Sequence, residues 1–252
     1  MSELIPLPQT LIPFLEPYFP NESNTNHPKK PFVTLTYAQS LDSRISAKPG
    51  TQTKLSHLET KTMTHYIRTR HDAILVGIGT ILADDPKLNC RYPETKSQPR
   101  PVIIDPNAKW KYQDSTLRKI CAEGKGLAPF IIVDESAGID SESHNCVLEQ
   151  GGKYVSLPLI GNTSNWAIIL DSLRQLGIKS VMIEGGARVI NDLLDFNKFS
   201  EKPIIDSIII TIAPVYLGIE GVQVSPSSRV DITDVKWWQG EQDSVLCGRP
   251  LQ

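Results

Sequence analysis

The segment from Ser180 to Arg188 constrains the fold more than any other part of this sequence. A run of apolar residues ends there in Glu184 and two adjacent glycines, and apolar residues then recur at helical spacing. The pattern predicts a buried strand that leads into a helix. Glycines at such a junction let another molecule approach the backbone, and the free N–H groups at the start of a helix attract phosphate. A tight strand–helix turn with a solvated glutamate is the alternative.

Other apolar runs predict the rest of an α/β domain. Strands alternate with two clear helices, the first opened by a capping box at Ser56 and Glu59 and the second ended by Gly177. This alternation indicates a mainly parallel central sheet, which binds ligands at the carboxyl ends of its strands. The strand-like residues 207–247 are expected to add antiparallel strands. The other predicted strands are residues 32–38, 73–77, 101–105, 130–134 and 208–214, and the helices are residues 56–70 and 166–176.

The first 31 residues differ in composition from the remainder. They contain seven prolines, with apolar residues such as Leu11, Leu15 and Tyr18 between them. Proline prevents a long helix, but the apolar side chains can dock on a folded domain. We therefore expect an extended proline-rich arm at residues 1–31 and a single domain at residues 32–252.

The overall composition is that of an ordinary globular protein, with 40% hydrophobic and 21% charged residues. A formal net charge of −2 gives no field that would attract nucleic acid, and no apolar run approaches the roughly 18 residues of a membrane helix. We expect a cytoplasmic protein with neither nucleic-acid nor membrane partners. The four cysteines are far apart and form no Cys-x-x-Cys pair, so no metal site is expected.

Polar side chains gather around the predicted strand at residues 73–77. Arg68 precedes this strand, and Thr80, Asp84 and Arg91 follow it. Thr80 is expected to cap a short helical turn, and the paired donors of a guanidinium suit a phosphate group. The alternative is that the two arginines form surface ion pairs with the neighbouring aspartates.

Four motifs occur together along the chain. They are QSLDSRI at residues 39–45, RxxxDAILVGxGTxxxDDPxLxxR at residues 68–91, EGGA at residues 184–187 and TIAPVxLG at residues 211–218. Together they resemble the riboflavin-biosynthesis reductase family over about residues 32–220. The resemblance is to the stand-alone members of fungi and archaea. Bacterial members carry a fused zinc deaminase, whose Pro-Cys-x-x-Cys element this chain lacks, so we expect reduction without deamination.

The family resemblance implies a dihydrofolate-reductase-like α/β fold, a homodimer and NADPH as hydride donor. It makes residues 32–252 the reductase domain. It also implies a small phosphorylated pyrimidine substrate, whose ribosylamino group is reduced to a ribitylamino group. Two alternatives stay open: a pterin reductase similar to dihydrofolate reductase, and a non-enzymatic NADP-binding protein.

The resemblance also carries expectations for single residues. Glu184 is the preferred catalytic residue, expected to hold the ribose and assist proton transfer, and Asp42 is second. Two positions depart from the family pattern, because Ser43 replaces a usual glycine and Thr36 stands where bacterial members carry a lysine. The expected NADPH contacts are Thr80, Asp84, Gly185, Gly186, Ala187 and Arg188. The expected substrate contacts are Arg68, Leu88, Arg91 and Glu184.

Overall fold

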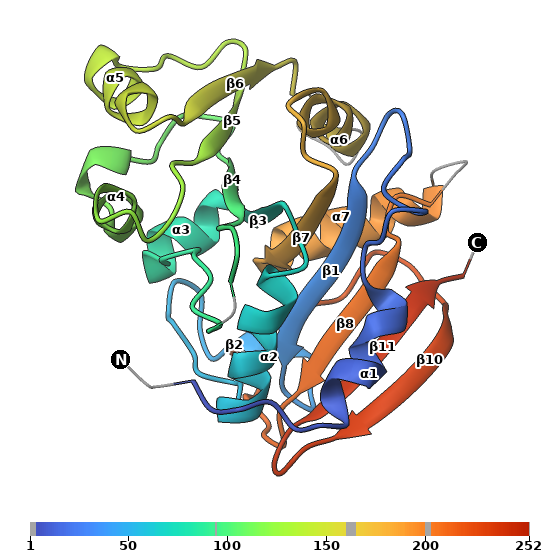
Figure 1. Cartoon of the computed structure of the whole chain (residues 1–252). Coiled ribbons are helices and arrows are strands. Elements are labelled where there is room, and N and C mark those ends of the chain that lie inside the picture. The colour runs from blue at the N-terminus through green and yellow to red at the C-terminus, as the bar shows by residue number, and fades with distance from the viewer. Residues whose placement is uncertain (1–3, 94, 160–164, 200–202, 252) are drawn as a thin grey trace.

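The computed structural model describes residues 4–93, 95–159, 165–199 and 203–251, and a single large sheet forms the centre of this part of the chain (Figure 1). The strands of this sheet are β1 (Phe32–Gln39), β3 (Ala73–Gly77), β4 (Arg100–Ile104), β5 (Phe130–Asp134), β6 (Lys153–Leu157), β7 (Ser180–Gly185), β8 (Ser207–Ile212), β10 (Ile232–Gln239) and β11 (Ser244–Pro250). Their spatial order is β10-β11-β8-β1-β7-β3-β4-β5-β6. A separate pair joins β2 (Arg44–Ser46) to β9 (Val222–Gln223).

The strands from β8 to β6 run parallel, whereas β11 and β10 add antiparallel beyond β8. The expected fold class, a mainly parallel sheet with antiparallel C-terminal strands, is therefore confirmed. All five residues of β3 are buried because helices cover both faces of the sheet. This double burial explains why the parallel strands are continuous apolar runs in the sequence.

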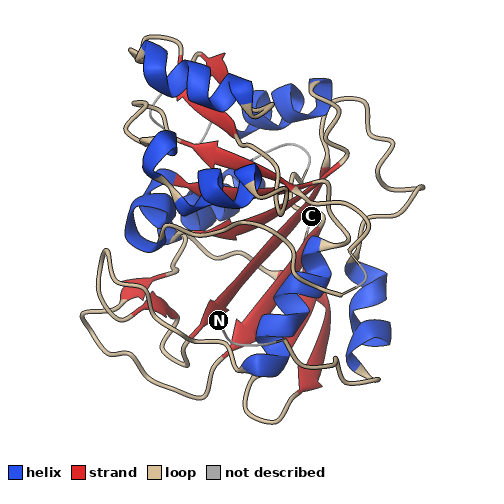
Figure 2. Cartoon of the chain, turned by 60° about the vertical axis from the view of Figure 1, so that its left-hand side comes forward, coloured by secondary structure: helices blue, strands red, loops and turns tan. Residues whose placement is uncertain are grey.

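The helices divide between the two faces of the sheet (Figure 2). Helices α6 and α7 pack on one face, and α2, α4 and α5 pack on the other. No helix in the described residues is both long and apolar enough to cross a membrane. The helices are α1 (Leu11–Leu15), α2 (Leu58–Arg68), α3 (Ile78–Asp84), α4 (Thr116–Ala122), α5 (Ser141–Glu149), α6 (Asn165–Gln175) and α7 (Ala187–Phe199), with short 3₁₀ turns η1 (Glu16–Tyr18) and η2 (Tyr112–Asp114).

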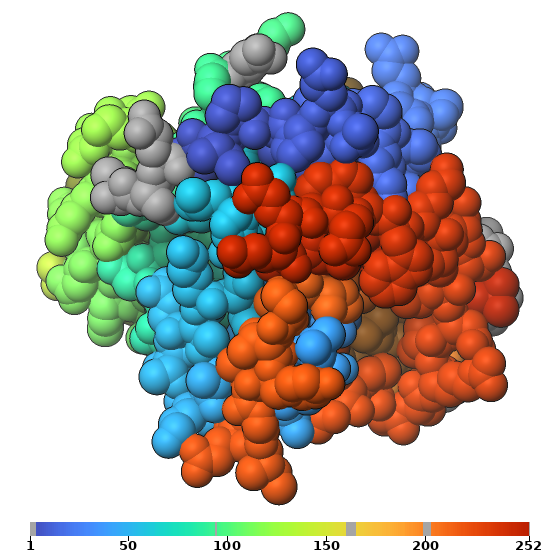
Figure 3. All heavy atoms as spheres, turned by 90° about the horizontal axis from the view of Figure 1, so that it is seen from below, coloured from blue at the N-terminus to red at the C-terminus, as the bar shows by residue number. Residues whose placement is uncertain are grey.

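The proline-rich arm packs on its own domain. It contains the short helix α1 and the turn η1, and is thus not wholly extended as the sequence predicts. Leu11, Leu15 and Tyr18 are fully buried in a cluster with residues of α2, β7, β8 and the β10–β11 hairpin. The Tyr18 hydroxyl donates a hydrogen bond to the backbone oxygen of Asp234, at 2.6 Å. In Figure 3 the arm, in dark blue, lies against the red C-terminal hairpin.

Two predicted helix caps are wrong. Helix α2 starts after His57, and no Ser56–Glu59 capping box forms; instead, the carboxylate of Asp243 accepts hydrogen bonds from the His57 backbone N, at 2.7 Å, and from the Thr60 hydroxyl. Helix α3 starts after Gly77 with no side-chain cap, so Thr80 lies inside this helix. In both cases the local sequence pattern identifies a helix but misplaces its start.

Candidate active site

A cleft of about 930 Å³ opens at the carboxyl ends of β3, β4 and β5 and at the start of α7. Five of the six expected NADPH contacts line it, although they come from two segments far apart in sequence. The sixth, Gly185, ends β7 one residue earlier, with a φ of +125° and a cis peptide bond to Gly186. The five lining residues are Thr80, Asp84, Gly186, Ala187 and Arg188.

Gly79 and Gly186 line the cleft, and the first of them faces open space. A Cβ atom on Gly79 would meet nothing within 4 Å, and one on Gly186 would lie 3.1 Å from the Thr80 hydroxyl oxygen. Ala187 and Arg188 start the 13-residue helix α7, whose first N–H groups have no partners within the helix. This arrangement fits a phosphate-bearing ligand, because such N–H groups and the helix dipole favour negative charge. Burial raises the pKa of Asp84 above its usual value.

Another part of the cleft lining comes from residues that the sequence motifs do not include. Ser46 ends β2 and Thr53 lies in the loop after it, whereas Asn107, Lys109 and Ser136 lie in the turns that follow β4 and β5. The sequence could have indicated the residues after β4 and β5 only by their position, because the predicted strands at residues 101–105 and 130–134 both end at this edge of the sheet.

A buried ion pair joins α2 to the end of β7. The Arg68 guanidinium binds the Glu184 carboxylate through two hydrogen bonds, Nε–Oε1 at 2.8 Å and Nη2–Oε2 at 2.7 Å. The two side chains are only 13% and 17% exposed. Arg68 Nη1 also donates to the backbone oxygen of Asn89, at 2.8 Å. The alternative of surface pairing between Arg68 and the aspartates after β3 is therefore wrong, as is a solvated Glu184.

Arg91 contacts the same helix one turn earlier. Its Nη2 lies 2.9 Å from Nε2 of His65, and its backbone N lies 3.2 Å from Nδ1 of that ring. Burial and the nearby charges of Arg68 and Arg91 lower the pKa of His65 to about 3, so the imidazole is neutral near pH 7. Leu88 adopts a φ of +45° and is buried in the core beneath α3. Arg68, Arg91 and Glu184 thus converge around His65 and Asn89.

Asp42 lies apart from this group, in the loop after β1. Its carboxylate accepts hydrogen bonds from the Ser40 hydroxyl, at 2.5 Å, and from the backbone N of Leu217 and Gly218, at 3.0 and 2.8 Å. These bonds, that of Ser40 first, lower its pKa to about 2. Ser43, which replaces the usual glycine, has a φ of +58° and adopts the left-handed backbone that glycine favours.

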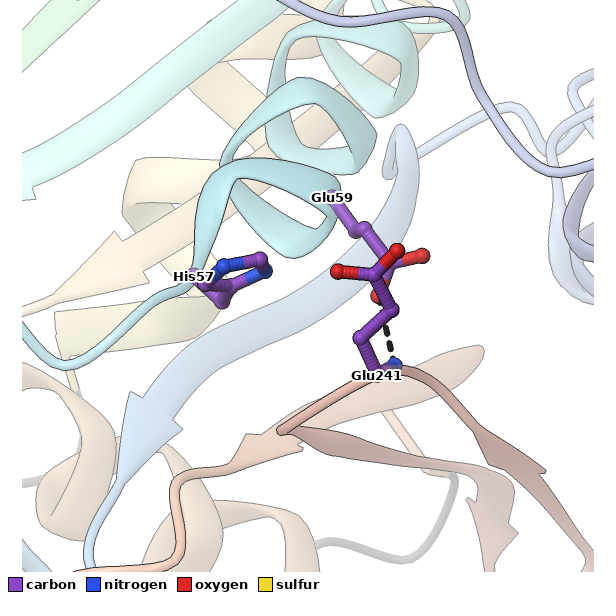
Figure 4. A group of neighbouring side chains, drawn as sticks. All are labelled: His57, Glu59 and Glu241. Atoms are coloured by element: carbon purple, nitrogen blue, oxygen red, sulfur yellow. Dashed lines mark hydrogen bonds between the residues drawn. The ribbon is translucent and has the colours of Figure 1, made fainter.

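One further polar group lies at the opposite end of α2. His57, Glu59 and Glu241 bring their side chains together where the β10–β11 turn meets the start of the helix (Figure 4). The buried Glu59 accepts a hydrogen bond from the backbone N of Glu241, at 2.8 Å, which docks the turn onto α2. This hydrogen bond gives the buried Glu59 carboxylate a structural role, which is to hold the turn on α2.

The structure is that of an α/β protein with a cleft at the carboxyl ends of its parallel strands. The chain belongs to the RibD C-terminal domain family, whose model matches residues 31–246. It is 59% identical over 252 residues, and 98% of each chain, to the 2,5-diamino-6-ribosylamino-4(3H)-pyrimidinone 5′-phosphate reductase of Debaryomyces hansenii. It is 43% identical over 251 residues, again 98% of each chain, to the protein of that name from Saccharomyces cerevisiae.

Solved structures agree with this assignment. The riboflavin biosynthesis reductase Rib7 of Saccharomyces cerevisiae superposes with a TM-score of 0.80 and 41% identity, over 96% of this chain and all of that one. RibD of Acinetobacter baumannii shares the fold, with a TM-score of 0.68 and 23% identity, over 89% of this chain and 59% of that one.

Proposed function

We propose that this protein reduces the ribosylamino group of 2,5-diamino-6-ribosylamino-4(3H)-pyrimidinone 5′-phosphate to the ribitylamino group, with NADPH, in riboflavin biosynthesis. The observation that carries the proposal is that the start of α7, which lines the cleft from Gly186 onwards, directly follows Glu184 of the buried Arg68–Glu184 pair at the end of β7. The first suits a nucleotide cofactor, and the second offers oriented polar groups for a sugar. The names of its full-length relatives support the same activity.

The cofactor would lie along the cleft, where Thr80, Asp84 and the start of α7 would hold it. The N–H groups of Ala187 and Arg188 would bind its pyrophosphate, with Gly186 allowing close approach. NADPH would supply a hydride to C1′ of the substrate. Gly185, which precedes this contact, is confined to glycine by its φ.

The substrate would occupy the α2 side of the sheet. We assign its 5′-phosphate to Arg91 and to Lys61, which shares one face of α2 with His65 and Arg68 at spacings of four and three residues. Burial, and then the charges of Arg91 and Lys54, lower the pKa of Lys61. A cluster of like charges of this kind favours a bound dianion. Arg68 would act mainly through Glu184.

Glu184 is the acceptor best placed to orient the ribose. Both of its oxygens are bound by Arg68, yet each carboxylate oxygen retains a further lone pair for a substrate hydroxyl. Oriented groups of this kind can supply a large share of the barrier reduction. Leu88 is buried in the core, so it would shape the wall beside the pyrimidine by fixing the loop that carries it. We keep Asp42 as the second candidate for proton transfer.

NADPH oxidation, followed by absorbance, tests the activity with three substrates: the diaminopyrimidinone phosphate, its deaminated analogue and dihydrofolate. We expect turnover to favour the diamino compound. Preference for the deaminated analogue would assign the chain to the bacterial order of reactions. Turnover of dihydrofolate alone would favour a pterin reductase, and tight NADPH binding without any turnover would favour a non-enzymatic role.

We propose further that the protein is a homodimer. Trp237 on the edge strand β10, together with Tyr216 and Ile219 in the loop after β8, exposes large apolar area. Light scattering should give twice the chain mass for the wild type and a shift towards monomer for Trp237→Glu.

We also propose a cytoplasmic location, which the four free cysteines support. Fractionation of cells that express the tagged protein tests it.

A further inference from the structure

The rim of the cleft carries a lysine whose place suggests a role in cofactor choice. Among the described residues that line the cleft, two are basic, Lys109 and Arg188. Arg188 lies on α7 and pairs with Asp192 on the same helix, with Nε 3.6 Å from Oδ2. Lys109 is exposed and follows β4, and β3 separates β4 from the strand that leads into α7. The two cations therefore lie at different parts of the cleft.

The turn that carries Lys109 is fixed by hydrogen bonds. Oδ2 of the buried Asp105 accepts from the backbone N of Trp110, at 2.8 Å. The backbone N of Asp134 donates to the backbone oxygen of Pro106, at 3.0 Å, which ties the turn to β5. Trp110 is itself buried in the core beneath α3. The backbone of Lys109 is thus held in place beside an anchored tryptophan.

Asp134, at the end of β5, also lines the cleft, but its carboxylate is hydrogen-bonded within the turn that follows β5. Asp134 accepts hydrogen bonds from the backbone N and the hydroxyl of Ser136, the first at 2.9 Å, and from the backbone N of Leu159, at 2.9 Å. Proteins that use NAD commonly bind the ribose 2′-hydroxyl with a free carboxylate near this kind of position. Here the charged side chain that remains near the ends of β4 and β5 in the cleft lining is the cation Lys109.

We propose that Lys109 binds the 2′-phosphate of the cofactor and so selects NADPH over NADH. The inference rests on the proposed function, because that function fixes the direction of the cofactor. Its nicotinamide must lie near Glu184 and the substrate, at the end of β7. Its adenosine must then extend past β3 towards the ends of β4 and β5, where Lys109 stands.

The test compares Lys109→Gln with Lys111→Gln. Lys111 is a matched control, since it lies two residues further along and pairs with Asp140, Nζ–Oδ2 at 2.6 Å. Calorimetry would measure binding of 2′,5′-ADP and of 5′-AMP, which differ by the 2′-phosphate alone. Lys109→Gln should weaken 2′,5′-ADP about tenfold and leave 5′-AMP unchanged, since one charged hydrogen bond is lost. Lys111→Gln should change neither, and melting temperatures should establish that both variants are folded.

Steady-state kinetics provides the second readout. In Lys109→Gln, kcat/KM should fall about tenfold with NADPH and stay constant with NADH. The proposal is overturned if Lys109→Gln binds 2′,5′-ADP as the wild type does, or if both fragments weaken together. Wild-type protein that binds neither NADPH nor 2′,5′-ADP would overturn the proposed function as well, which separates the two failures.

Discussion

The Arg68–Glu184 pair shows what a single residue contributes to this protein. Its two side chains are largely buried and held by two hydrogen bonds, so the loss of either leaves a charge without its partner. Breaking a buried pair costs about 3–5 kcal/mol of folding free energy. If Glu184 has the role proposed above, activity and stability are coupled at this residue, and an experiment there must measure both.

We expect Glu184→Gln to lower kcat by about 100-fold, the size of effect seen when a positioned electrostatic group is removed from an active site. The amide keeps the shape of the side chain but loses the charge. The melting temperature should fall too, because Arg68 then lacks a counter-charge. Affinity for NADPH should change much less than kcat, since this side chain binds Arg68 and is not among the described residues that line the cleft.

Glu123→Gln is the control, because this exposed glutamate pairs with Lys125 away from the cleft. It should have wild-type kcat and melting temperature. Wild-type turnover in Glu184→Gln would remove this residue from the reaction.

Asp42 gives a prediction about pH. Its pKa is about 2 in the folded protein and 3.8 without the hydrogen bonds from Ser40, Leu217 and Gly218. Because the folded value is the lower one, the carboxylate stabilises the fold above about pH 4, and this contribution is lost as the pH falls towards 2. Melting curves of wild type and Asp42→Asn should therefore differ at pH 7 and converge between pH 4 and pH 2. A constant difference over that range would contradict this account of the loop.

At the scale of elements, the start of helix α2 depends on a residue far away in sequence. Asp243, 2% exposed, lies in the β10–β11 turn and accepts from the His57 backbone N and the Thr60 hydroxyl. The same turn is docked by Glu59. Helix α2 carries Lys61, His65 and Arg68, so this contact would position one side of the proposed substrate site.

Asp243→Ala should lower the free energy of unfolding by about 1–3 kcal/mol, the cost of leaving buried hydrogen-bond donors without their acceptor. Urea denaturation measures the change. Asp231→Ala, in which an exposed ion pair with Arg229 is lost, should stay within about 0.5 kcal/mol of wild type. Equal stability of the two variants would mean that the distant cap does not support α2.

The elements that sequence reasoning found are those with a strong local pattern. The parallel strands are buried on both faces and therefore read as unbroken apolar runs, and Gly177 with a φ of +87° ends α6 where expected. Strand β6 and the short helices α4 and α5 were missed because their residues are mixed and only partly buried. The contact of Asp243 with the start of α2 could not be predicted, because no sequence pattern near residue 57 indicates a partner 186 positions away.

The candidate site was predictable to a similar extent. The glycines and Thr80 belong to compact motifs, so one wall of the cleft could be expected. Lys109 and Ser136 lie in turns of ordinary composition, and only the sheet order brings them to the cleft. Arg68 and Glu184 were both expected at the substrate, but their mutual ion pair joins residues 116 positions apart and leaves no local signal.

At the scale of the whole molecule, the proline-rich arm is part of the core. Leu15 and Tyr18 fill a cluster with Met182 and Ile209 of the sheet, and the arm bonds to both α2 and the hairpin through Ile5 and Tyr18. The arm thus covers one face of the sheet that would otherwise be open.

Leu15→Ala should lower the free energy of unfolding by about 2–5 kcal/mol, because it leaves a cavity where a fully buried leucine stood. Urea denaturation again gives the value. Leu148→Ala is the matched control, as Leu148 is 47% exposed, and should stay within about 0.5 kcal/mol of wild type. A Leu15→Ala protein as stable as this control would show that the arm is dispensable.

The position of β1 in the sheet has a consequence for how the chain is made. β1 lies between β7 and β8, whose residues follow it by more than 140 positions, at Ser180 and Ser207. During synthesis, the apolar residues of the arm and of β1 therefore leave the ribosome long before their partners exist. These apolar residues stay exposed, and prone to aggregate, until β7, β8 and the C-terminal hairpin have emerged. A ribosome stalled after residue 180 should thus hold a chain that depends on chaperones, and protease resistance should appear only once residue 250 is free.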